Sequence, residues 1–181
     1  MAPGPGSVLI HLPHSHRIVV LTSTQRIPVG SIIDARSGSV ALASALDASG
    51  TPQTASFTKG IFQVTQERSG MTDIHLRGGS FTGCPSSDNQ HGHLKLAVSA
   101  RAYHGAKRIV RSLWASDHHG HYRTYGRNSV AVVRGTSWIT TEHCNGTRTT
   151  VLKGAVSVRD RHRHRTVMVR PSRSYLARAA H

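Results

Sequence analysis

Short runs of alternating apolar and polar residues recur along the whole chain. In the run 73–77, for example, Ile74 and Leu76 alternate with charged residues or histidine, which predicts a strand with one buried face. Turns rich in Gly, Pro, Ser or Asn separate the runs at intervals of about ten residues, as in sandwiches, barrels and solenoids. Strands are expected at 8–12, 18–21, 31–34, 39–42, 57–64, 73–77, 94–98, 130–133, 166–170 and 174–177. We therefore expect an all-β fold, either an elongated two-layer sandwich or a solenoid-like stack of short strands and hairpins.

The length of 181 residues suits one domain. We expect a flexible leader at residues 1–6 (MAPGPG) and a single domain at 7–178. A weak internal echo, in which Gly-Thr, a threonine-rich strand and Lys-Gly are followed by an alternating strand, recurs at 50–64 and 146–158. Such self-similarity is compatible with two pseudo-repeats, about 7–100 and 101–178.

The segment 106–129 (AKRIVRSLWASDHHGHYRTYGRNS) has two readings. Its apolar residues fit one face of a two-turn helix, but the turn-rich stretch 116–120 favours a hairpin, because no helical cap follows Trp114. Asn145-Gly146 has the form of a type I′ hairpin turn, and Gly135 and Gly154 are expected at tight corners.

The charge is strongly basic, with 23 Lys plus Arg against 8 Asp plus Glu and a net charge of +15. Such an excess favours polyanionic partners, namely nucleic acid or an anionic cell-surface polymer. The candidate contacts are the arginines near the aromatic residues of 114–125 and those of the run 161–165. They are Arg111, Arg123, Arg127, Arg161, Arg163 and Arg165. The alternative is hairpin packing for the first three and a solvated hairpin tip for the others.

The two cysteines, Cys84 and Cys144, lie far apart in the sequence and form no C-x-x-C pair. This arrangement favours one disulfide and an exported protein, and the alternative is two unrelated buried thiols. The first residues do not have the form of a signal peptide, and no stretch is long enough for a transmembrane helix. We therefore expect a piece of a longer extracellular or cell-surface protein.

Catalytic motifs of the common hydrolases, zinc proteases and nucleotide-binding loops are absent from the sequence, which favours a non-enzymatic role without a cofactor. Histidines do cluster, and neutral imidazoles at such spacing can bind zinc or copper. The candidates are His118, His119 and His121 in one segment and His91 and His93 in another. The alternative is that these histidines only make the surface more soluble.

Residues 132–140 (VVRGTSWIT) and 147–158 (TRTTVLKGAVSV) resemble the FecR-like domain, in which a V-x-G-T-x-[FW]-x-V strand precedes an alternating strand with a central glycine. TVMVRPSRSYLA resembles the closing strand of that family, and RIPVGSIIDARSGSVAL resembles its start. The resemblance implies an exported all-β module, of the kind found in actinobacterial surface proteins. FecR proteins pass signals to a sigma factor, but this chain lacks their membrane helix and cytoplasmic segment. We therefore expect a structural or interaction module whose partner is an unknown protein or an anionic cell-surface polymer, with nucleic acid less favoured.

Overall fold

A computed structural model describes residues 1–15, 17–85 and 107–180. The strand expected at 94–98 lies outside these ranges, as do His91 and His93.

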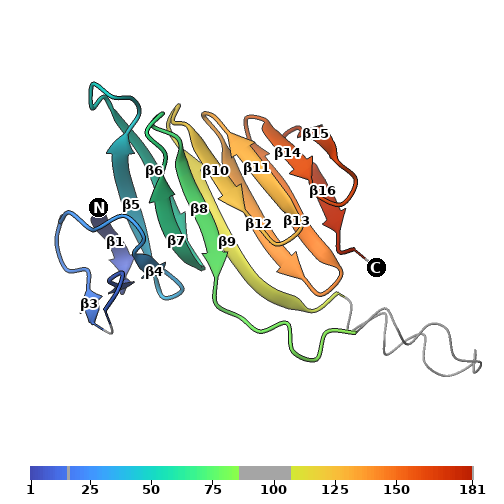
Figure 1. Cartoon of the computed structure of the whole chain (residues 1–181), viewed down its shortest axis with the longest axis horizontal. Coiled ribbons are helices and arrows are strands. Elements are labelled where there is room, and N and C mark those ends of the chain that lie inside the picture. The colour runs from blue at the N-terminus through green and yellow to red at the C-terminus, as the bar shows by residue number, and fades with distance from the viewer. Residues whose placement is uncertain (16, 86–106, 181) are drawn as a thin grey trace, which may run out of the picture.

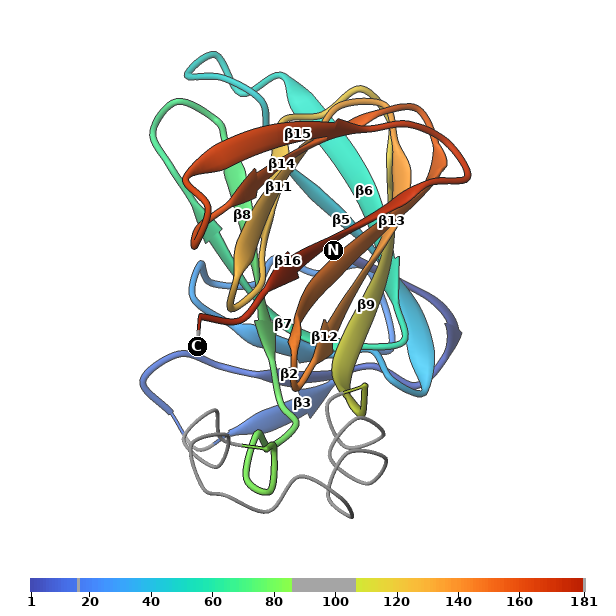
Figure 2. The same ribbon diagram turned by 90° about the vertical axis from the view of Figure 1, so that its right-hand side faces the viewer.

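The described chain contains no helix and folds into two β-sheets that pack face to face (Figures 1 and 2). Sheet A has seven strands in the spatial order β1 (Ala2–Gly6), β5 (Gly38–Ala45), β6 (Pro52–Thr58), β9 (Ile109–Asp117), β12 (Ser137–His143), β13 (Gly146–Lys153) and β16 (Ser174–Arg178). Sheet B has nine, in the order β15 (Arg165–Val169), β14 (Val156–Asp160), β11 (Ser129–Val133), β10 (Tyr122–Tyr125), β8 (Thr72–Arg77), β7 (Ile61–Gln66), β4 (Ile32–Asp34), β2 (Leu9–His11) and β3 (Ile18–Val20). The expected all-β sandwich is confirmed.

The chain builds the sandwich by alternating between the two sheets. Hairpins such as β5–β6 in sheet A and β7–β8 in sheet B are joined by arches at the strand ends, and β9 enters sheet A singly, between β8 and β10 of sheet B in chain order. Each step advances along the long axis, so the first strands lie at one end and β15 and β16 at the other (Figure 1). The pairings are antiparallel except for β8 with β10. The two halves of the chain are continuous, because β6 pairs with β9 in sheet A and β8 with β10 in sheet B.

The sequence led us to expect a flexible leader at residues 1–6, but the structure places most of this segment in a strand. Ala2–Gly6 forms β1, which pairs with β5 along one edge of sheet A. Met1 is buried, and its ammonium group donates a hydrogen bond to the carbonyl oxygen of Gln25 at 2.9 Å. The buried methionine side chain and the pairing with β5 together hold this segment against the sandwich.

The segment 106–129 forms strands, as expected, but the described part of it is not a hairpin. β9 belongs to sheet A and β10 to sheet B, and residues 118–121 form the arch between them. Leu113 on β9 and Tyr122 on β10 are both fully buried. β9 and β10 therefore face each other across the core, and each strand contributes buried side chains to it. This arrangement explains why the segment contains two separate groups of apolar residues.

The turn between β12 and β13 differs from the predicted type I′ turn at Asn145-Gly146. His143 pairs with Gly146, so the two loop residues are Cys144 and Asn145, and Gly146 is the first residue of β13. Asn145 does not have the positive φ that a type I′ turn requires. A Cβ atom on Gly146 would lie 2.3 Å from the carbonyl oxygen of Ala177. Glycine is therefore needed at this position because the backbone of β16 comes very close.

The internal echo corresponds to the same architectural step made twice. β6 continues through Lys59-Gly60 into β7, and β13 continues through Gly154 and Ala155 into β14, each time from sheet A to sheet B. The single strand expected at 57–64 is therefore split by an arch. The left-handed residue is Lys59 (φ 58°) in the first arch and Gly154 (φ 75°) in the second.

The core between the sheets contains four large aromatic side chains, each at most 1% exposed: Trp138, Tyr122, Phe57 and Phe62. The rings of Phe57 and Phe62 lie 4.8 Å apart across the sheets, and the indole N–H of Trp138 donates a hydrogen bond to the hydroxyl of Thr124 at 3.1 Å. Burial raises the pKa of Tyr122 to about 12, so its phenol stays neutral in this apolar setting.

Candidate functional site

Asp117, at the end of β9, joins two neighbouring arches. Its carboxylate accepts hydrogen bonds from the backbone N–H groups of Gly120 (3.0 Å), Gly135 (2.7 Å) and Thr136 (2.7 Å). Gly120 lies in the arch from β9 to β10, and the other two lie in the arch from β11 to β12. The side chain is 4% exposed. A buried carboxylate that accepts three backbone N–H groups acts as a structural clamp between the two arches.

Glu142 forms a second clamp at the opposite end of β12. Its carboxylate, 0% exposed, is bound by the guanidinium group of Arg111, the backbone N–H of Arg127 and the hydroxyl of Thr147. Arg127 belongs to the turn between β10 and β11, so the clamp ties a turn of sheet B to three strands of sheet A, β9, β12 and β13. The charge is neutralised locally by Arg111, as a buried carboxylate requires.

Asp160, at the end of β14, forms a third clamp. It accepts hydrogen bonds from the backbone N–H of Arg163 at 2.9 Å and from the hydroxyl of Tyr175 at 2.7 Å. Burial by itself would raise the pKa of Asp160, but these bonds and the nearby Arg163 charge hold it below its usual value. Tyr175 lies on β16, so this carboxylate also links the two sheets.

The predicted Cys84–Cys144 disulfide is present, with the two Cα atoms 5.2 Å apart. Cys144 lies in the β12–β13 turn, beside the Glu142 clamp, and Cys84 follows β8 after a short stretch of turns. The bridge therefore attaches the segment after β8 to the end of sheet A. A disulfide at this position is compatible with an oxidising, extracellular setting.

The remaining described carboxylates are also engaged in local structure. Asp34 pairs with Arg36, whose side chain lowers the pKa of Asp34. The Asp47 carboxylate binds Ser49 and Thr51 in its own loop, and these bonds lower its pKa to about 2. Asp73 and Glu67 both bind Arg123. Each of the seven acidic residues that the structure describes thus has a partner in the scaffold.

The six arginines singled out from the sequence do not form one surface. Arg111 is held by Glu142, and Arg123 is held by Asp73 and Glu67, which raise the pKa of Arg123. The guanidinium group of Arg127 instead lies over the ring of Phe81, 4.8 Å from its centre. The neighbouring aromatic residues are also separated, because Tyr122 is in the core, Tyr125 faces outward on sheet B and Trp114 faces outward on sheet A.

The run 159–165 forms a turn at its centre, and its arginines do not project to one side as an alternating strand would. Residues 161–164 form the four-residue turn between β14 and β15. Arg161 lies over the ring of Tyr125 at 5.7 Å, whereas Arg165 lies over Tyr175 and binds its hydroxyl. Within the described residues, Arg161, Arg163 and Arg165 form no salt bridge, so this turn, together with Arg165, is a basic tip on the molecule.

Beside the basic tip, His75 and Tyr125 stack on the outer face of sheet B. Their rings are 4.5 Å apart and nearly parallel, with an angle of 21°, because the two residues pair directly between β8 and β10. Burial lowers the pKa of His75, and the imidazole also contacts the hydroxyl of Thr65 at 3.1 Å. The stack is a neutral aromatic platform next to the cation of Arg161.

The histidine hypothesis gains no support from the arrangement of His118, His119 and His121. In the described part of the chain, no three His, Cys, Asp or Glu side chains form a group that could hold a metal ion. The three histidines lie within the arch between β9 and β10, where His119 has a left-handed backbone (φ 60°). The other candidates, His91 and His93, lie outside the described residues.

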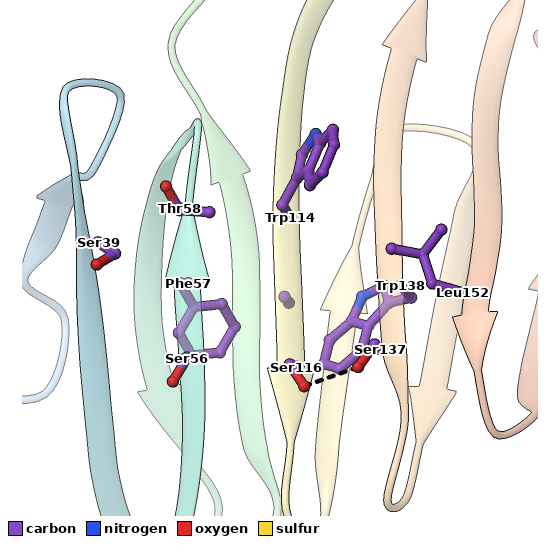
Figure 3. Close-up of a pocket in the computed structure, with 10 residues that line it drawn as sticks. Ser39, Ser56, Phe57, Thr58, Trp114, Ser116, Ser137, Trp138 and Leu152 are labelled. Carbon is purple, nitrogen blue, oxygen red and sulfur yellow. Dashed lines mark hydrogen bonds between the residues drawn. The ribbon is translucent and has the colours of Figure 1, made fainter. Parts of the chain in front are cut away.

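A shallow hollow of about 270 Å³ lies on the outer face of sheet A (Figure 3). Ser56, Ser116 and Ser137 are paired side by side on β6, β9 and β12, and their small side chains leave the space open. Trp114 and Leu152 project beside it. From its sequence context, Trp114 was expected only to pack in a hairpin or to join a basic cluster. The alternation Ser112-Trp114-Ser116 is a further signal in the sequence, because it places the indole on the solvent side of β9.

Among the described residues, no helix is long and apolar enough to cross a membrane. Comparison of the chain with protein-family models, with curated proteins and with solved structures found no match.

Proposed function

We propose that this protein is a non-enzymatic interaction module of an extracellular or cell-surface protein. The observation that carries the proposal is the use of the carboxylates. Asp117, Glu142 and Asp160 clamp the two sheets together, and the other described acids pair with arginine or close a loop. Acid–base or nucleophilic catalysis by a carboxylate needs a side chain that is free to act on a substrate, and the described carboxylates are engaged in the scaffold. The disulfide and the resemblance to FecR-like domains support an exported location.

Two broad outer faces are left for partners, and their chemistry differs. The outer face of sheet B carries Arg123, Tyr125 and His75 near the basic tip, whereas the outer face of sheet A is dominated by serine, threonine and Trp114. A rigid sandwich with loops fixed by clamps and a disulfide presents such faces without rearrangement, which lowers the entropic cost of binding.

Binding to a panel of immobilised polymers tests the proposed function. The panel contains neutral polysaccharides, heparin, polyphosphate and single-stranded DNA. We expect saturable binding to at least one polymer, with no change in the polymer's length, when the folded protein is measured by biolayer interferometry and the polymer by size-exclusion chromatography. The reduced and alkylated chain is the control. Binding to none of them, or shortening of a polymer, would contradict the proposal.

A second candidate function, polyanion binding, is favoured by one observation, the position of the basic tip beside the His75–Tyr125 stack. Single-stranded nucleic acids and sulfated glycans are bound by cations next to stacking aromatics. Arg161 and Tyr125 supply this combination, and Arg163 and Arg165 add charge, since neither forms a salt bridge with a described carboxylate, although Asp160 lies near Arg163.

Variants of the basic tip test whether polyanions bind at this site or are attracted only by the net positive charge of the protein. We expect the triple variant Arg161→Ala, Arg163→Ala, Arg165→Ala to weaken heparin or DNA binding roughly tenfold or more at physiological salt. The matched control replaces the exposed Arg17, Arg26 and Arg68 with alanine, which changes the net charge equally at positions outside the tip. If both variants lose the same affinity, the tip is not a site.

A further inference from the structure

The hollow on sheet A has a lining that contains no charged residue. Its hydroxyl groups come from Ser39, Ser56, Thr58, Ser116 and Ser137, and its apolar surface comes mainly from Trp114 and Leu152. Ser116 and Ser137 share a hydrogen bond of 2.7 Å, which fixes two of these hydroxyls on the floor (Figure 3). A few placed polar groups within an apolar surface are typical of small-molecule sites.

Trp114 is exposed although tryptophan is usually buried. Its exposed fraction is 38%, whereas that of Trp138, the other tryptophan of the chain, is 0%. The ammonium group of Lys59 lies 4.0 Å from the centre of the Trp114 ring, and Lys59 does not line the hollow. The cation–π contact therefore braces the indole from outside the hollow. A ligand would meet an aromatic surface that is already held in place.

Three occupants fit an aromatic surface on a sheet, and the lining favours one of them. A nucleotide would bring phosphates, but no lining residue is charged, and the ammonium group of Lys59 beside the hollow already contacts the indole of Trp114. A second copy of the chain would need a broad apolar interface of about 800 Å² per partner, whereas the residues paired across this face are mostly serine and threonine. A sugar ring presents a C–H face that packs on an indole and hydroxyl groups that exchange hydrogen bonds with serine and threonine.

The shape of the lining indicates a chain of sugars. The lining runs from Ser39 on β5 across β6, β9 and β12 to Leu152 on β13. Neighbouring strands are about 4.8 Å apart, so this row spans roughly 19 Å across the sheet. That distance exceeds one sugar ring.

We propose that the hollow beside Trp114 binds a neutral oligosaccharide segment of an extracellular or cell-surface polysaccharide. This inference rests on the proposed function and names one partner class for one face. Trp114 provides the stacking surface, and the serines of β6, β9 and β12 provide the hydrogen bonds.

The test is titration calorimetry of the whole protein with gluco-, manno-, xylo- and chito-oligosaccharides of about four to six residues. Two variants address the site in opposite ways, because Trp114→Ala removes the stacking surface and Ser137→Phe fills the hollow. We expect either change to weaken binding at least tenfold. The matched control is Val132→Ala, since Val132 is exposed to a similar fraction (39%) on the outer face of sheet B. Circular dichroism checks that each variant is folded.

Several results would overturn this inference. They are binding to none of the oligosaccharides, wild-type affinity in both site variants, or a dimer in sedimentation that Trp114→Ala dissociates. The polymer panel keeps the two proposals distinct. If heparin or another polymer still binds while oligosaccharides do not, only the sheet A site fails, whereas loss of all binding contradicts the interaction module itself.

Discussion

Replacing Asp117 with alanine should lower the free energy of unfolding by about 3–5 kcal/mol, because three backbone N–H groups lose their acceptor and an unpaired buried donor costs about 1–3 kcal/mol. The carboxylate of Asp117 binds Gly120, Gly135 and Thr136, and two of these contacts are fully buried. Domains of this size are stable by about 5–15 kcal/mol, so the variant would lose a large part of its stability. Urea denaturation followed by fluorescence measures the change.

The Asp117→Asn variant tests whether the stability depends on the two accepting oxygens of Asp117 or only on the volume of its side chain. Both carboxylate oxygens of Asp117 accept N–H groups, so an amide at this position must point its own NH₂ group at a donor. We expect asparagine to be nearly as destabilising as alanine. The control is Asp47→Ala, which also removes a carboxylate that accepts backbone N–H groups, but in an exposed loop. The clamp would be contradicted if Asp117→Asn kept the stability of the wild-type protein, or if Asp47→Ala lowered the free energy of unfolding as much as Asp117→Ala does.

Removal of the disulfide should be the other large effect. Cys84 and Cys144 are separated by 60 positions, and closing a loop of that length stabilises by about 4 kcal/mol in the chain-entropy model. We expect the double variant Cys84→Ser, Cys144→Ser to be less stable by roughly this amount. Equilibrium unfolding in urea, with and without reductant, measures it.

Reductant provides the internal control for the disulfide. The wild-type protein should fall to the stability of the double variant when reduced, and the double variant should not respond to reductant. A wild-type protein that is indifferent to complete reduction, or a double variant that loses less than about 1 kcal/mol, would show that the clamps alone fix this end of the sandwich.

The sequence predicted most strands well because alternation reports which side chains are buried. It could not say which sheet a strand enters. A hairpin and an arch use the same turn residues, so 116–120 resembled a hairpin although β9 and β10 lie in different sheets. The arch brings Tyr122 into the core from the opposite side, and no local pattern encodes that choice.

The candidate sites were harder to predict because their partners are distant in the sequence. Asp117 binds Gly135 and Thr136, which are 18 and 19 positions away. Glu142 binds Arg111 at a separation of 31 positions. Arg111 and Arg123 looked available for a polyanion because the sequence does not show that a carboxylate lies beside each. The disulfide was predicted correctly, since only two cysteines exist to be paired.

The prolines of β1 affect whether a strand of another molecule can pair with the edge of sheet A. β1 is the edge strand of sheet A, and two of its five residues, Pro3 and Pro5, have no N–H group. An incoming strand needs a regular row of donors and acceptors, and proline on an edge strand is one way in which proteins limit such pairing. The proline-rich segment thus disfavours edge-to-edge aggregation at this margin of the molecule, a hazard that grows with protein concentration.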